Sequence, residues 1–157
     1  MFKLLRMLRK SKQNLKIGFD LDGVLATQSE IEIVLSKSNP KLEMMYYRTR
    51  KPNIDIKLFG ANQDTFVIIT CRKQELKVVT LEWCAKFFPN IPLYILSVPQ
   101  WKSDDQWQEF YRQIAEAKAP LINELKLDVY FEDIPFVVQE LRRLCPHCRI
   151  IQYGGRI

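Results

Sequence analysis

The sequence predicts one domain with an α/β fold, in which about five parallel strands form a sheet with helices on both faces. Short apolar runs rich in β-branched residues alternate with longer segments whose apolar residues recur at helical spacing. This alternation is typical of parallel strands joined by helical crossovers. The chain has 157 residues, 47% of them hydrophobic, which is enough for one sizeable core.

The expected strands are short apolar segments bounded by glycine, proline or acidic residues. The first includes Ile17, Phe19 and Leu21 and ends before Gly23. The others are expected over residues 66–71, 93–98, 127–133 and 149–153. The run Phe-Val-Ile-Ile-Thr-Cys at 66–71 shows no polar alternation, which indicates a central strand buried on both faces.

Helices are expected between these strands. Leu76, Val79, Trp83 and Phe87 form one apolar stripe and predict a helix over residues 74–88. Because proline is tolerated in the first turn of a helix, Pro120 is expected to open a separate helix that ends near residue 126. The remaining helices are expected near residues 31–35, 42–47, 104–114 and 136–144.

Two acids stand one residue apart after the first strand and before a glycine. Alternate residues of a strand share a face, so Asp20 and Asp22 are expected to point to one side. Two carboxylates at one spot are costly unless a cation lies there, and an oxygen-rich site of this kind suits Mg²⁺. A D-x-D-G sequence is also common in ordinary turns, so the interpretation depends on the strands that follow.

The run Asp20-Leu-Asp22-Gly-Val-Leu resembles the first motif of the haloacid dehalogenase-like (HAD-like) phosphatases. Thr70, at the end of an apolar strand, resembles their second motif, and Glu132-Asp133 resembles the acidic pair that completes their metal site. The resemblance implies a Rossmann-like (HAD-like) sheet with a small cap. It also implies a Mg²⁺-dependent phosphomonoesterase that works through an aspartyl-phosphate intermediate.

The resemblance implies a role for each matching residue. Asp20 is the expected nucleophile, Asp22 the general acid/base, and Thr70 a ligand of the phosphoryl group. Mg²⁺ is expected to bind Asp20, the backbone carbonyl of Asp22 and Asp133, with Glu132 acting through water or from further out. The alternative for Asp133 is that it caps the helix that follows.

The resembled family also has one lysine that neutralises the nucleophile and the phosphoryl group. A helix that precedes a parallel strand runs antiparallel to it, so its first residues lie at the carboxyl edge of the sheet, where ligands bind. This geometry favours Lys118 over Lys126.

The domain is expected to span residues 15–157, after a basic extension at 1–14 and with a small cap inserted at about 27–65. The extension has an apolar helical face and is either a contact for membrane or nucleic acid or a solvated segment. The candidate substrate-binding residues are Arg48, Arg50, Arg72 and Lys73. A solvated basic surface is the alternative for Arg48 and Arg50.

Charge and cysteine content limit the partners and the compartment. The net charge of +6 favours anionic partners: a phosphorylated small molecule, a nucleotide or a nucleic acid. No run approaches the roughly 20 apolar residues of a membrane span, and the four cysteines are interpreted as reduced thiols of a cytoplasmic protein. The alternatives to a metabolite phosphatase are a nucleic-acid 3′-phosphatase and a non-catalytic basic module that binds nucleic acid or membrane.

Overall fold

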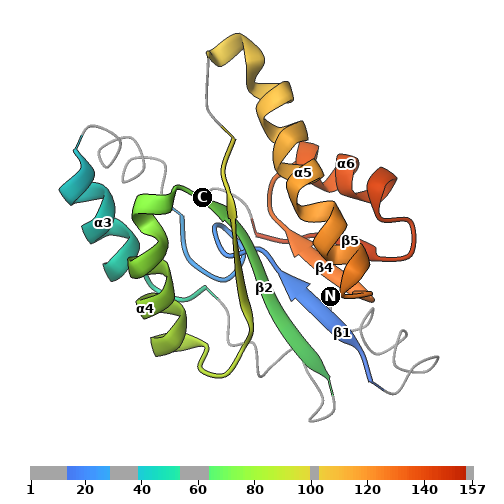
Figure 1. Cartoon of the computed structure of the whole chain (residues 1–157), viewed down its shortest axis with the longest axis horizontal. Helices are drawn as coiled ribbons and strands as arrows, with labels where there is room; N and C mark the ends of the chain where they lie inside the picture. Colours follow the sequence, from blue (N-terminus) through green and yellow to red (C-terminus); the bar gives the residue numbers. More distant parts are fainter. Residues whose placement is uncertain (1–13, 29–38, 54–63, 100–102, 155–157) are drawn as a thin grey trace.

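The computed structural model describes residues 14–28, 39–53, 64–99 and 103–154. Five parallel strands form one sheet with the order β3-β2-β1-β4-β5 (Figure 1). The strands are β1 (Lys16–Phe19), β2 (Thr65–Arg72), β3 (Leu93–Ser97), β4 (Val129–Glu132) and β5 (Arg149–Gln152). The predicted α/β fold with about five parallel strands is confirmed.

β1 lies at the centre of the sheet. Its residue Phe19 is in register with Ile68 of β2 and with Phe131 of β4. From β1 the chain builds outward through β2 and β3, and it then returns to add β4 and β5 on the other side. The winding therefore changes direction between β1 and β4, and open parallel sheets bind ligands beside the strand ends at such a point.

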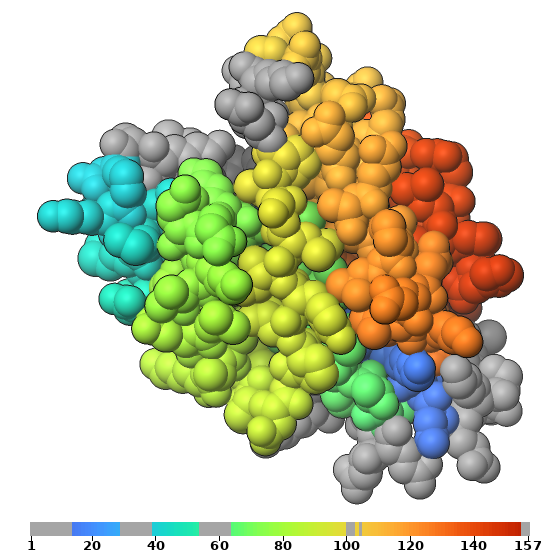
Figure 2. All heavy atoms as spheres, in the orientation of Figure 1, coloured from blue at the N-terminus to red at the C-terminus, as the bar shows by residue number. Residues whose placement is uncertain are grey.

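Helices cover both faces of the sheet, as predicted (Figure 1). Trp83 packs with Phe19 on one face, and Ile122 and Val137 pack with Ile69 on the other. The helices are α3 (Pro40–Thr49), α4 (Lys77–Phe87), α5 (Trp107–Glu124) and α6 (Pro135–Leu144), with the short 3₁₀ turns η2 (Gln74–Leu76) and η3 (Asp104–Gln106). Figure 2 shows α3 and α4 at one side of the molecule and α5 and α6 at the other.

The prediction of a separate helix beginning at Pro120 is wrong. α5 runs without a break from Trp107 to Glu124 and contains Pro120 in its interior. An interior proline costs about 3 kcal/mol because it lacks an N–H and crowds the preceding turn. Ala119 and Ile122 are buried in the core that α5 shares with α6 and the sheet, and this packing holds the helix together across the proline.

Two strands, β1 and β4, end earlier than the apolar runs suggested. β1 ends at Phe19, and Leu21 lies in the turn that follows. The backbone carbonyl of Leu21 accepts hydrogen bonds from the N–H groups of Leu25 and Ala26. β4 ends at Glu132 rather than at Asp133. Asp20, Asp22 and Asp133 therefore lie just beyond the strands, and Glu132 is the last residue of β4.

Several expectations fall on residues outside the described ranges. These are most of the basic extension (residues 1–13) and the short helix near 31–35. Within the expected cap the structure describes α3, which matches the helix predicted over 42–47; the domain boundaries and the cap role stay predictions. Among the described helices, none is long and apolar enough to cross a membrane.

Candidate active site

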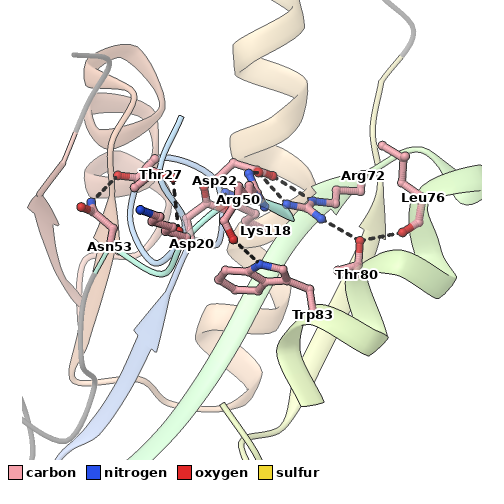
Figure 3. Close-up of polar contacts among 12 residues, drawn as sticks. Asp20, Asp22, Thr27, Arg50, Asn53, Arg72, Leu76, Thr80, Trp83 and Lys118 are labelled. Carbon is pink, nitrogen blue, oxygen red and sulfur yellow. Dashed lines mark hydrogen bonds and ion pairs between the residues drawn. The ribbon is translucent and has the colours of Figure 1, made fainter. Parts of the chain in front are cut away.

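The carboxylate of Asp20 lies at the centre of a buried ion-pair cluster. The backbone N–H of Asp20 donates to the carbonyl of Phe131 at 2.8 Å, which fixes the residue beside the end of β4. Lys118 Nζ donates to Asp20 Oδ1 at 2.8 Å and to Glu132 Oε2 at 2.7 Å. All three side chains are at least nine-tenths buried, so a single ammonium group on α5 joins the residue after β1 to the last residue of β4. Figure 3 shows Lys118 beside Asp20.

Asp133 adds a further carboxylate to this cluster. The side chain is buried, and its Oδ1 has no hydrogen-bond partner in the structure. Helix capping does not account for this position, because Ile134 is the N-cap of α6 and no side chain caps the helix there. A buried carboxylate oxygen without a partner is costly, so Asp133 fits a site that a cation completes.

The carboxylates of Asp20, Glu132 and Asp133 match the chemistry of a divalent-cation site. One oxygen of each lies within 4.8 Å of the others. Three carboxylates and the single ammonium of Lys118 leave a net charge of −2 when all are ionised. Hard cations such as Mg²⁺ prefer oxygen ligands of this kind, so the residues present fit Mg²⁺.

Gly23 forms the turn against which Asp133 packs. Its φ of +77° lies in the left-handed region, and a Cβ added there would lie 2.1 Å from Asp133 Oδ2. The glycine therefore serves both the turn and the close approach of the carboxylate.

We expect Gly23→Ala to lower the free energy of unfolding by at least about 1–2 kcal/mol, because alanine is strained at positive φ and its Cβ collides with Asp133. Urea unfolding in EDTA measures the loss. Gly23→Asn separates the two causes, because asparagine tolerates this φ better but carries the same Cβ. A Gly23→Ala protein as stable as the wild type would contradict the expectation.

The cluster shifts the pKa values of its members. Burial raises the pKa of the Asp20 carboxyl to about 7; Lys118 opposes this shift, and the neighbouring carboxylates add to it. Burial, with repulsion from Asp20 and Glu132, raises the pKa of Asp133 to about 9. Burial lowers the pKa of Lys118, but the carboxylates of Asp20 and Glu132 outweigh it and hold that pKa well above its ordinary value. The ammonium thus stays charged, and the acids are the groups that need a cation.

Stability without metal is expected to fall as the pH rises. A carboxyl whose pKa is raised by folding binds its proton more tightly in the folded state, so its contribution is complete below the ordinary value of about 4 and is lost as pH passes the folded value. For Asp20 and Asp133 this loss extends to about pH 7 and pH 9. In EDTA, the melting temperature should drop between about pH 5 and pH 9, and Mg²⁺ should raise it more at the higher pH.

Calorimetry at several pH values, with EDTA and with Mg²⁺, measures this dependence. Asp133→Asn should flatten the slope in EDTA, because it removes one of the raised carboxyl groups. A melting temperature that rises with pH in EDTA, or an equal effect of Mg²⁺ at both ends of the range, would contradict the assignment.

Asp22 belongs to a second cluster beside the first, rather than sharing the contacts of Asp20. Arg72 Nε donates to Asp22 Oδ2 at 2.9 Å, and Arg72 Nη2 donates to Oδ1 at 2.6 Å. Arg50 Nη1 also donates to Asp22 Oδ1, so the carboxylate lies between two guanidinium groups (Figure 3). The two acids were expected to point to one side, but they contact different cations. Asp20 contacts Lys118, and Asp22 contacts the two arginines.

The other candidate substrate-binding residues lie in exposed ion pairs. Arg48 pairs with Glu82 at 3.1 Å, and Lys73 pairs with Glu43 at 3.0 Å. These pairs join α3 to α4 and η2 at the surface, and the structure does not bring either cation to the buried cluster. Their roles in substrate binding stay predictions.

Thr70 is buried in β2, which lies next to β1, and is in register with Ile95 of β3. Its neighbour Cys71 is unsuited to act as a nucleophile, because burial raises the pKa of the thiol to about 11. Cys145 and Cys148 are free thiols in the turn after α6, as predicted, and burial raises their pKa values to about 11 and about 12. None of these thiols is a thiolate at neutral pH.

Sequence reasoning missed the aromatic surroundings of the two arginines. The Arg50 guanidinium carbon lies 4.9 Å from the centroid of Tyr47 and 5.5 Å from that of Trp83, and Arg72 lies 4.5 Å from Tyr47. The apolar stripe of the helix over residues 74–88 predicted that Trp83 is buried, but it did not predict the contact of Trp83 with Arg50. No sequence signal links Arg50 to Asp22, because 28 residues separate them.

Comparisons with known proteins place the chain by its fold. No protein-family model matches it, and no curated protein matches its sequence significantly. A structure of the Pnkp1/Rnl/Hen1 complex contains a chain with a TM-score of 0.59 and 16% identity over 90% of this chain. A structure of the Pnkp1/Rnl/Hen1 RNA repair complex gives a TM-score of 0.60 and 15% identity, also over 90%.

This chain spans less than half of the length of either matched chain, 46% and 42%. The HAD domain of effector protein Lem4 from Legionella pneumophila is a weaker match, with a TM-score of 0.40 and 17% identity, covering 90% of this chain and 86% of that domain. At such low identity, the two stronger matches establish a shared fold and nothing finer. The chain therefore has a parallel α/β fold also found in RNA repair complexes, with a buried acidic cluster at the switch point of its sheet.

Proposed function

We propose that this chain is a Mg²⁺-dependent phosphomonoesterase of the haloacid dehalogenase-like superfamily that works through an aspartyl-phosphate intermediate. The observation that carries the proposal is the contact of Lys118 with both Asp20 and Glu132, next to the Asp133 carboxylate, whose Oδ1 has no hydrogen-bond partner among the described residues. The cluster lies where the sheet changes its winding direction, which is the usual ligand position in such folds.

Asp20 is the proposed nucleophile. One of its carboxylate oxygens forms a bond to phosphorus, and the bond from phosphorus to the leaving oxygen breaks with its electron pair. Asp22 gives its proton to that oxygen and then takes one from the water that hydrolyses the aspartyl-phosphate, after which Asp20 is restored.

Lys118 and Thr70 are the proposed ligands of the transferred phosphoryl group. Lys118 remains charged and already contacts Asp20, so it can neutralise an equatorial oxygen as charge develops there. Asp20, Asp133 and the backbone carbonyl of Asp22 would hold Mg²⁺, with Glu132 acting through water. When bound, the ion would neutralise the phosphate oxygens and the carboxylates.

The proposed substrate is a nucleotide or another phosphorylated metabolite. The second candidate is the terminal 3′-phosphate of a nucleic acid, because the net charge is +6 and structures of RNA repair complexes contain chains of similar fold. A non-catalytic basic module that binds nucleic acid or membrane is the competing class.

Phosphate release from a panel of monoesters tests the proposal. The panel contains nucleotides, sugar phosphates, aryl phosphates and an oligonucleotide with a 3′-phosphate, each with Mg²⁺ and with EDTA. Mg²⁺-dependent release is expected, and the preferred member distinguishes the metabolite from the nucleic acid. Salt-sensitive binding of the oligonucleotide with no release from any member would overturn the phosphatase and favour the binding module.

A further inference from the structure

We propose that Arg50 is a positioning residue for the proton transfer of Asp22, together with Arg72. The inference rests on the proposed function and assigns a task to a residue from the expected cap. Its basis is the arrangement of donors around one carboxylate.

The two arginines occupy three of the four acceptor positions of Asp22. A carboxylate oxygen accepts about two hydrogen bonds. Oδ1 accepts from Arg50 Nη1 and Arg72 Nη2, whereas among the described residues Oδ2 accepts only from Arg72 Nε. The remaining acceptor position is on Oδ2, so this is the oxygen that is open to a leaving group or to water.

The two arginine side chains are less exposed than the Asp22 carboxylate that they contact. The side chains of Arg50 and Arg72 are each 2% exposed, whereas the side chain of Asp22 is 21% exposed. A substrate can therefore reach Asp22 more readily than it can reach either guanidinium group. This burial agrees with arginines that orient the acid.

Several contacts hold the two arginines in place. Arg72 Nη1 donates to Thr80 Oγ1 at 2.7 Å, and the Thr80 hydroxyl donates to the carbonyl of Leu76 at 2.7 Å. Trp83 Nε1 donates to the backbone carbonyl of Arg50 at 2.9 Å. The ring of Tyr47 lies against both guanidinium groups, so neither arginine is free to turn toward a ligand without repacking.

Backbone hydrogen bonds hold the segment after α3 close to the turn that contains Asp22. The backbone carbonyl of Lys51 accepts from the N–H of Thr27 at 3.0 Å, and the backbone N–H of Asn53 donates to the carbonyl of Leu25 at 2.7 Å. These bonds pin the segment that follows Arg50 to the turn that follows Asp22.

Two donors of Arg50 have no partner. Its Nε and Nη2 are buried and make no hydrogen bond in the structure. Leaving buried donors unsatisfied costs stability, and these two donors remain open to a ligand. The contact with Asp22 is the one side-chain hydrogen bond that Arg50 makes among the described residues, and the positioning role rests on this contact.

The experiment compares kcat/KM of the wild type and Arg50→Met on phenyl phosphates whose phenol leaving groups become progressively more acidic. A poor leaving group needs the proton of Asp22, and an acidic phenol leaves without it. The variant should lose about 10-fold or more on the least acidic phenol, with a loss that shrinks steadily along the series. Arg143→Met is the matched control, because its guanidinium is exposed and pairs within α6; it should leave the whole series unchanged.

An arginine that binds the phosphate would give a different pattern. Its loss would reduce kcat/KM by the same factor for every member, and this result would overturn the proposal, as would no loss at all. Arg50→Lys keeps the charge but not the two-pronged guanidinium geometry, and it should show the same trend with smaller losses. If Arg50→Met does not fold, kcat/KM is measured along the same phenyl phosphate series with Arg50→Lys.

Urea unfolding in EDTA tests the contact independently of activity. The midpoint shift of the double variant Arg50→Met/Asp22→Asn should be smaller than the sum of the two single shifts, because both remove one interaction. Additive shifts would overturn the proposal even in an active enzyme. A wild type that releases no phosphate from any phenyl phosphate would instead overturn the proposed function, and with it the catalytic task of Arg50, while the unfolding measurement would still report the contact.

Discussion

Asp20→Asn is expected to lower kcat/KM for phosphate release by at least about 10³-fold, because removal of a covalent nucleophile leaves only binding and electrostatic stabilisation. The amide cannot attack phosphorus as the carboxylate does, and it also weakens the cation site formed with Asp133. The measurement is the steady-state release of phosphate from the best substrate of the panel, with saturating Mg²⁺.

Asp105→Asn is the matched control for Asp20→Asn. It makes the same chemical change at an exposed residue of η3, and it should keep full activity. The melting temperature of both variants shows whether the fold is intact. A folded Asp20→Asn protein that retains more than a tenth of the wild-type activity would contradict the assignment of Asp20 as nucleophile.

A covalent label adds a second readout for Asp20. Wild-type protein quenched in acid during turnover of a ³²P-labelled substrate should carry label that hydroxylamine removes, as an acyl phosphate does. Asp20→Asn should carry none. Label that persists in the variant would move the nucleophile to another residue.

The second large effect is expected on stability. Lys118→Met should lower the free energy of unfolding in EDTA by about 3–5 kcal/mol, because removal of one partner leaves buried charges without compensation. Lys118 is the cation that contacts both Asp20 and Glu132 inside the protein. Urea unfolding near neutral pH measures the loss.

Lys126→Met is the control for this change. Lys126 is exposed just after α5, so its loss should change stability by less than about 0.5 kcal/mol. The double variant Lys118→Met/Glu132→Gln should recover part of the loss, because it removes one of the uncompensated carboxylates. A Lys118→Met protein as stable as Lys126→Met would contradict a buried ion-pair cluster.

Local patterns were sufficient for the architecture and for part of the site. Apolar runs such as 66–71 mark buried strands because a parallel sheet covered on both faces excludes water from both sides of each strand. Asp20 and Glu132-Asp133 could be placed at one edge because parallel strands bring their carboxyl ends together. Lys118, chosen over Lys126, does lie against Asp20. The ground for that choice is wrong, because it placed Lys118 at the start of a helix and α5 begins at Trp107.

Interactions between distant segments were not visible in the sequence. The pairing of Arg50 with Asp22 depends on how α3 docks on α4, and no local spacing encodes that docking. The continuity of α5 through Pro120 depends on apolar packing that outweighs a local preference.

The sequence by itself determined the order of the elements, the parallel sheet and the residue types at its carboxyl edge, because these follow from hydrophobic periodicity and chain direction. Only the tertiary structure decided which charge meets which. Lys118 contacts Asp20 and Glu132, and Arg50 and Arg72 contact Asp22. The physical reason is that the interaction of charges depends on distance and burial, and these quantities are defined only when distant segments of the chain have packed together.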